Sequence, residues 1–276
     1  MTAAFYDLHS HSTASDGSLT PAELVNRALH QGVQALALTD HDTVAGLSEA
    51  SQAAQATSLK LIPGIELSAN WNGQCYHIIG LGIDPEYPPL ITASKNLQQI
   101  RLQRAEKIAG KLVQKKIYGA LEAVLSAAGD SMVTRNHFAD FLLAQNFVSS
   151  KQDAFDRFLG QGKPAFVATE WAELTDTVNW ITGSGGIAVL AHPMRYKLTT
   201  ARMLKLLAEF KTAGGSAIEV VTGQSNSDEI RRAAGFAKRL NLAASCGSDF
   251  HTPNQWIELG RLADMPIDLQ PVWELF

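Results

Sequence analysis

Two short segments at opposite ends of the chain each present a pair of potential metal ligands two residues apart. His9 and His11 end a strand-like stretch that begins at Phe5, and Asp249 and His251 follow a second strand-like stretch. Side chains at positions i and i+2 of a strand point to the same face, so each pair can converge on one ion. We therefore predict that both pairs bind metal.

Further histidines and carboxylates stand at the ends of apolar runs or just after them. One such side chain alone is weak evidence, since a lone histidine at a strand end is more often a core residue than a ligand. Here, however, six of the eight histidines and three carboxylates share this placement. Such repetition is typical of an active site at the strand ends of an α/β barrel. The additional residues are Asp16, His41, Glu66, His77 and His192.

The elements that must position these residues alternate between strand and helix. A capping box at Thr20, with Pro21 as the first helical residue, predicts a helix to about Gln31. Seven strands are expected, one fewer than in a complete eight-stranded barrel. The expected strands lie around residues 5–11, 35–39, 59–68, 74–83, 187–191, 217–222 and 243–246. The other expected helices are 44–56, 170–182, 200–213 and 227–240.

The segment 88–162 interrupts this alternation with helix-period stretches and almost no strand signal. We predict a helical insertion, a lid over a barrel formed by residues 1–87 and 163–276. From 95 to 165, eleven Lys and Arg face six Asp and Glu, a local net charge of +5 that leaves −9 for the rest. Three divalent ions would bring the chain from −4 to +2, which favours an anionic substrate for the metal-loaded form.

The composition is that of a soluble globular protein, with 46% apolar and 18% charged residues. We expect no membrane span, no signal peptide and a cytoplasmic location. Cys75 and Cys246 are expected to be buried free thiols. A nucleic-acid-binding protein without chemistry is disfavoured, because a pI near 6.1 lacks the large positive surface that such binding needs. Nothing in the sequence indicates an obligate protein partner.

The order and spacing of the candidate ligands resemble those of the PHP (polymerase and histidinol phosphatase) phosphoesterase family. The resemblance runs from Asp7 to His251, and all nine ligand positions are filled. It implies a distorted seven-stranded barrel of the α/β class, a (β/α)7 barrel, and three divalent ions. Manganese is expected first, and iron or zinc would also suit a set of imidazoles and carboxylates without cysteine.

Carried over by position, the resemblance implies three ligand sets. The first ion would be held by His9, His11, Glu66 and Asp249, the second by Glu66, His77 and His192, and the third by Asp16, His41 and His251. Glu66, Asp249 and His251 are the expected catalytic residues. Asp40 and Asp42 are candidates for orienting an imidazole from behind, although a helix cap and a turn explain them equally well.

The insertion narrows the resemblance to a bacterial subgroup, through Thr134-Arg135-Asn136-His137 and the segments around Lys163 and Arg195. The subgroup removes the 3′-phosphate of nucleoside 3′,5′-bisphosphates or trims 5′-phosphorylated RNA from its 5′ end. Both reactions cut the phosphoester on a 3′-oxygen next to a held 5′-phosphate. The expected substrate contacts are Asp16, His41, Arg101, Arg104, Arg135, Lys163 and Arg195.

Two other functions compete with this interpretation. One is a phosphomonoesterase like histidinol-phosphate phosphatase, and the other is a PHP module that binds metal without catalysis. The basic insertion and the motif at Thr134 favour a nucleotide, and the complete ligand set favours catalysis.

Overall fold

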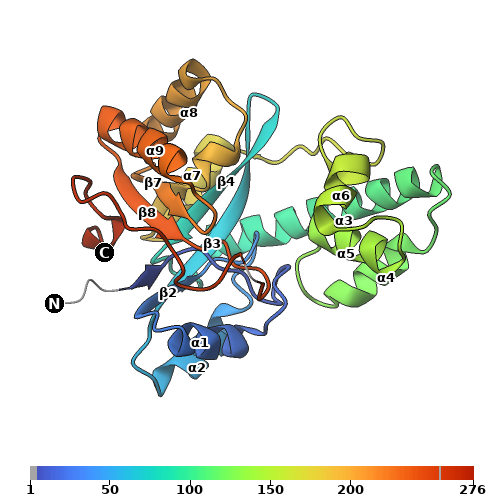
Figure 1. Ribbon diagram of the computed structural model, residues 1–276, viewed down its shortest axis with the longest axis horizontal. Helices are drawn as coiled ribbons and strands as arrows, with labels where there is room; N and C mark the ends of the chain where they lie inside the picture. Colours follow the sequence, from blue (N-terminus) through green and yellow to red (C-terminus); the bar gives the residue numbers. More distant parts are fainter. Residues whose placement is uncertain (1–4, 255) are drawn as a thin grey trace.

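The computed structural model describes residues 5–254 and 256–276, and it contains a nearly closed barrel (Figure 1). The strand order is β1-β2-β3-β4-β6-β7-β8, with the short β5 paired to the outer end of β3. Hydrogen bonds from Leu8 N to Cys246 O and from His11 N to Phe250 O join the first strand to the last. The strands are β1 Tyr6–Asp7, β2 Ala35–Leu38, β3 Lys60–Trp71, β4 Gln74–Leu81, β5 Ala172–Glu173, β6 Ile187–Leu190, β7 Ala217–Thr222 and β8 Ala243–Gly247.

The seven strands predicted from the sequence form the barrel, so the distorted seven-stranded prediction is confirmed. The regular part of the first strand is shorter than expected, because residues 8–11 continue in an irregular path between Thr39 and Phe250. Gly247 permits the close contact of β8 with this path, since a Cβ there would overlap with the backbone and Cβ of His9.

Strand β4 runs against its neighbours. It pairs antiparallel with both β3 and β6, whereas the other pairs along the barrel are parallel. A two-residue turn joins β3 to β4, and its residues Asn72 and Gly73 have φ values of 51° and 74°. Asn-Gly is the preferred sequence for such a hairpin turn. Because β4 is reversed, its first half, not its last, lies at the mouth of the barrel.

Two apolar layers hold the barrel. Small and branched side chains such as Ala37, Ile79 and Val189 fill its narrow interior. The other face of each strand packs against the surrounding helices (Figure 1). Those helices are α1 Pro21–His30, α2 Leu47–Gln55, α7 Leu174–Gly183, α8 Thr200–Thr212 and α9 Ser227–Leu240. Helix α1 begins at the predicted capping box, whereas α2 begins three residues later than expected and α7 four, the latter because 172–173 form β5.

The helical segment projects to one side of the barrel (Figure 1). Its first helix, α3 Pro88–Val113, packs with Leu90 and Leu97 in the barrel's outer layer and with Ile108 and Leu112 in a second apolar core. The remaining helices around that second core are α4 Ala120–Ala128, α5 Arg135–Ala144, α6 Lys151–Ala154 and the π-helical turn Phe155–Leu159. None of the helices in the described ranges is long and apolar enough to span a membrane.

Of the two cysteines, Cys246 is buried and Cys75 is exposed. The expectation that both are buried is therefore wrong for Cys75. It lies on β4 two residues before His77, so both side chains point to the same face, opposite to the buried Tyr76.

Candidate metal centre

Glu66 lies at the centre of the site. It is fully buried on β3, and the imidazole nitrogens of five histidines lie within 3.4 Å of its two oxygens. A carboxylate offers about four lone-pair directions, so hydrogen bonding alone does not explain why five rings gather there. From nearest to farthest the nitrogens are His41 Nδ1 at 2.8 Å, His77 Nδ1 at 3.0 Å, His192 Nε2 at 3.2 Å, and His9 Nε2 and His11 Nε2 at 3.4 Å each.

Asp249 completes one side of this cluster. Its Oδ1 lies 3.3 Å from His9 Nε2 and 3.2 Å from His11 Nε2, and those two nitrogens are 3.1 Å apart. The backbone of Asp249 has a left-handed φ of 54°, as does that of His192 at 29°. Such conformations cost of order 1–3 kcal/mol for residues with a Cβ, and they turn both side chains into the cluster.

Asp16 forms the other side, and the helical segment positions it. Its Oδ1 lies 3.4 Å from His251 Nε2 and 4.0 Å from His41 Nε2. Its Oδ2 accepts hydrogen bonds from Thr134 Oγ1 at 2.7 Å and from Asn136 Nδ2 at 2.8 Å. The motif at the start of α5 therefore orients a barrel carboxylate, a role that the sequence analysis had not assigned to it.

All nine candidate ligands thus lie in one cluster, and their atoms suit divalent ions. Buried atoms without a hydrogen-bond partner include Glu66 Oε2, His11 Nδ1 and His192 Nδ1, and the set lacks sulfur. The ligand atoms form three compact groups, and within each group all atoms lie within 4.8 Å of one another. They are His11, Asp16, His41 and His251; His9, His11 and Glu66; and His41, Glu66 and His77. Relative to the expected allocation, His11 also joins the Asp16 group, and His41 also faces Glu66.

The electrostatics match this arrangement. Burial alone would raise the pKa of the Glu66 carboxyl, but His77, His41 and His9 hold it well below its usual value. In turn burial would lower the pKa of His77, but Glu66 raises it to about 10. Burial lowers the pKa of His41 to about 4, despite the neighbouring Glu66 and Asp16. Negative and positive groups are therefore packed together in a water-poor site.

The two aspartates beside His41 do not orient an imidazole. Asp40 accepts from Ser12 N at 2.8 Å and from the hydroxyls of Ser12 and Ser15 at 2.6 Å each. Asp42 accepts from Ser68 N at 2.6 Å and from Arg101 Nε at 2.6 Å. Both carboxylates hold loops and helices in place around the site.

Sequence reasoning missed Glu219, whose Oε1 lies 3.0 Å from His9 Nδ1. It is 1% exposed in the middle of β7, between Ile218 and Val220. A signal for it exists in the sequence, because a carboxylate inside an apolar strand is costly to bury without a partner.

The four candidate phosphate-binding arginines differ in their surroundings. Arg101 is buried, and its guanidinium donates to Asp42, Ser68 Oγ and Val133 O. Arg195 pairs with Oδ2 of Asp249. These two already have acceptors in the protein.

Arg104 and Arg135 are different, because no ion pair to a carboxylate is found for either among the described residues. Arg104 lies over the ring of Trp171, and Arg135 over that of Phe155. Burial lowers the pKa of both groups, and Arg101 repels both. Arg104 follows Arg101 by one helical turn, and Arg135 follows Thr134, which contacts Asp16, so both arginines lie beside the cluster. Lys163 is exposed on the loop after the π-helical turn.

Comparison with known proteins shows the family of the chain. The PHP domain family matches residues 7–158, more than half of the chain. The chain belongs to the PHP domain family.

Three proteins illustrate how this PHP chain relates to others. It is 45% identical to a 5′-3′ exoribonuclease from Haemophilus influenzae, over 98% of both chains. It is 39% identical to a 3′,5′-nucleoside bisphosphate phosphatase from Chromobacterium violaceum, over 97% of this chain and 94% of that one. A solved structure of an amidohydrolase from C. violaceum, with bound sulfate and no metal, has a TM-score of 0.94 at 39% identity. That alignment covers 99% of this chain and 95% of that one.

Proposed function

We propose that this chain is a metal-dependent phosphoesterase that cuts the phosphoester on the 3′-oxygen of a nucleotide whose 5′-phosphate it holds. A nucleoside 3′,5′-bisphosphate would lose its 3′-phosphate, and a 5′-phosphorylated RNA would lose its first nucleotide. The observation that carries the proposal is the gathering of five imidazoles around the buried Glu66. The names of the two curated relatives support both substrate classes.

We assign three divalent ions, manganese first, to the nine clustered side chains, with Glu66, Asp249 and His251 as the catalytic ligands. Divalent ions held there would supply an activated water and neutralise charge on the phosphate. The protein's part is to aim the imidazole nitrogens at one centre. Glu66 does so by contacting five rings, and the backbone of Asp249 does so by turning its carboxylate towards His9 and His11.

Arg104 and Arg135 are the residues that we assign to the 5′-phosphate. Two desolvated cations without a carboxylate partner favour an anionic ligand, and guanidinium groups donate in pairs to phosphate oxygens. Arg101 instead ties α3 to the barrel through Asp42, so we assign it a positioning role. On this view residues 88–162 form the substrate lid of a barrel domain assigned to 1–87 and 163–276.

One comparison of substrates tests the proposal. The purified protein is offered a nucleoside 3′,5′-bisphosphate, a 5′-phosphorylated oligoribonucleotide, its 5′-hydroxyl twin and histidinol phosphate, each with manganese and each after exhaustive chelation. We expect rapid hydrolysis of the first two substrates and none after chelation. Full activity in chelator would refute the metal assignment, and equal rates on the oligonucleotide and its 5′-hydroxyl twin would refute the phosphate-binding assignment.

A further inference from the structure

Among the described buried carboxylates outside the nine candidate ligands, Glu219 stands apart because it contacts two of those ligands. Its Oε1 lies 3.0 Å from His9 Nδ1, and its Oε2 accepts a hydrogen bond of 2.6 Å from the backbone N of His192. A register shift of β7 against β8 between Glu219 and Val221 marks a bulge, which re-aims side chains.

The contact with His9 decides which nitrogen of that ring carries a proton. A carboxylate oxygen accepts a hydrogen bond from a ring N–H, so the contact of Oε1 with Nδ1 favours the tautomer protonated at Nδ1. The Nε2 then keeps its lone pair, and it points at Asp249, Glu66 and His11. This is the tautomer that a metal ligand needs.

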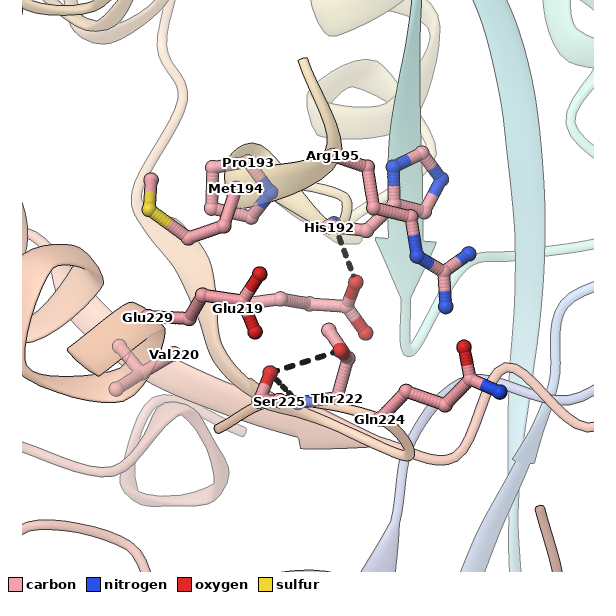
Figure 2. A pocket seen from close by; sticks show the side chains of 10 residues that line it. All are labelled: His192, Pro193, Met194, Arg195, Glu219, Val220, Thr222, Gln224, Ser225 and Glu229. Carbon is pink, nitrogen blue, oxygen red and sulfur yellow. Dashed lines mark hydrogen bonds between the residues drawn. The ribbon is translucent and has the colours of Figure 1, made fainter. Parts of the chain in front are cut away.

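The contact with His192 holds a strained backbone. His192 has φ 29° and ψ 56°, a conformation that residues with a Cβ rarely adopt. The bond from its N–H to Glu219 fixes the residue at the end of β6, from which its Nε2 reaches within 3.2 Å of Glu66. Figure 2 shows this bond, with the Glu219 carboxylate lying beneath His192.

Packing alone does not fix the Glu219 carboxylate. A cavity of about 120 Å³ borders it, lined also by Met194, Thr222, Gln224 and Ser225 (Figure 2). With free space on one side, the side chain is held by its two hydrogen bonds. Its two oxygens are therefore held as hydrogen-bond acceptors for the two histidines.

We propose that Glu219 is a positioning residue of the metal centre, which sets the tautomer of His9 and the backbone of His192. The inference rests on the metal-binding part of the proposed function, and it concerns a residue outside the nine ligands.

Glu219→Gln is the sharpest test because it keeps the shape and removes one acceptor. A glutamine offers one oxygen and one NH2 group to two donors. Either the His192 N–H loses its partner, or the His9 ring turns to the tautomer whose Nε2 carries a proton. We expect the variant to fold and to bind manganese about 10- to 100-fold more weakly, as measured by calorimetry on the metal-free protein.

The tautomer has its own readout. In the zinc-loaded wild-type protein, ¹⁵N spectra of the imidazoles should show His9 protonated at Nδ1, with the signal assigned by its loss in His9→Gln. In Glu219→Gln this pattern should change if the amide NH2 turns towards His9, and it should persist with weaker metal binding if the NH2 faces the His192 N–H. A residue that only filled space would leave both the pattern and the affinity unchanged.

Asp40→Asn is the matched control. Asp40 is an equally buried carboxylate near the site, but its partners are Ser12 and Ser15. We expect a change in the melting temperature of the metal-free protein with the manganese affinity kept. If Glu219→Gln does not fold, Glu219→Asp keeps both acceptors one methylene farther back, and we expect a weaker metal affinity at a near-normal melting temperature.

The outcomes separate this inference from the proposed function. A wild-type protein that binds no metal refutes the proposed function itself. A wild-type protein that binds metal, with Glu219→Gln or Glu219→Asp binding equally tightly and an unchanged His9 spectrum, overturns the inference about Glu219 alone.

Discussion

The histidine cluster around Glu66 and the arginine pair Arg104–Arg135 are both partly desolvated, but they favour ligands of opposite charge. The cluster suits cations, and the arginine pair suits an anion. Around Glu66, buried atoms such as Glu66 Oε2 and His11 Nδ1 have no hydrogen-bond partner among the described residues. At Arg104 and Arg135, two guanidinium groups lie near each other without an ion-paired carboxylate. Polar groups buried without partners are costly, and proteins keep them mainly where a ligand completes them.

A third place shows what a completed arrangement looks like. Arg101 lies one helical turn from Arg104, and it pairs with Asp42 at 2.6 Å in the protein interior. The difference between these two arginines separates a structural cation from a binding one. Substitutions in the Glu66 cluster, the Arg101–Asp42 pair and the Arg104–Arg135 pair test this difference.

The largest effect is expected at the candidate metal ligands. Glu66→Gln keeps the shape of the side chain but removes the charge that faces five imidazoles. We expect turnover to fall on the order of 10⁴-fold or more, because water activation by the ions is lost. Steady-state rates, metal content and circular dichroism check this. Asp249→Asn should behave alike, and appreciable turnover in either variant would contradict the assignment.

The next effect concerns the completed pair. Arg101→Met leaves Asp42 charged and buried without its cation, which costs about 3–5 kcal/mol in comparable cases. Urea unfolding should show this loss in the free energy of unfolding. Arg104→Met on the same helix is the control, since it leaves no paired carboxylate behind. Equal destabilisation by the two substitutions would remove the distinction between the two arginines.

A smaller effect is expected at the arginine pair Arg104–Arg135. Arg135→Met keeps the aliphatic stem over Phe155 but removes a donor. We expect kcat/KM on 5′-phosphorylated substrates to fall about 10- to 100-fold, since a hydrogen bond to a charged group contributes ~1.5–3 kcal/mol. The 5′-hydroxyl twin should show no change. Arg157→Met, an exposed arginine paired with Asp153, is the control, and a similar loss there would refute a specific phosphate site.

The smallest effect belongs to a complete pair outside the candidate metal centre. Arg27 donates to both oxygens of Glu258, at 2.9 and 2.6 Å, and these bonds lower the pKa of Glu258. A lowered carboxyl pKa stabilises the fold above the unfolded value of about 4.3, and the benefit disappears as the pH falls through the folded value. Glu258→Gln should therefore cost about 1 kcal/mol at pH 7 and almost nothing near pH 3, with unchanged turnover.

Thermal unfolding at the two pH values measures this difference. Asp140→Asn, which affects an exposed pair with Lys151, should change stability by less than the Glu258 variant at both pH values. A pH-independent loss in Glu258→Gln would show that packing, not charge, holds this contact.

The sequence predicted the barrel and the cluster because both depend on local signals. Apolar runs marked each strand, and candidate ligands such as His41, His192 and Asp249 stand directly after them. The capping box at Thr20 placed the start of α1. The reversed β4 escaped the prediction although its signal, Asn72-Gly73, lay in the chain.

Other features had no local signal. Arg101 pairs with Asp42, which is 59 residues away in the sequence. This contact follows from how α3 crosses the barrel, and no motif indicates it. The contacts of Thr134 and Asn136 with Asp16 likewise join distant segments. Cys75 looked like a core residue from its neighbours, but its side chain shares the face of His77 and not that of the buried Tyr76.

Under the proposed function, the reversed strand β4 also affects the distance between the phosphate-binding Arg104 and the metal ligands. After β4 the chain leaves the barrel at the end away from the mouth, and α3 returns along the wall as one helix of 26 residues, about 39 Å long. Arg104 therefore reaches the mouth on a rod anchored in the barrel's outer layer, not on a loop. Under the proposed function, α3 would hold Arg104 at a fixed distance from the ions. That fixed distance between the bound 5′-phosphate and the ions would release a single nucleotide at each cut.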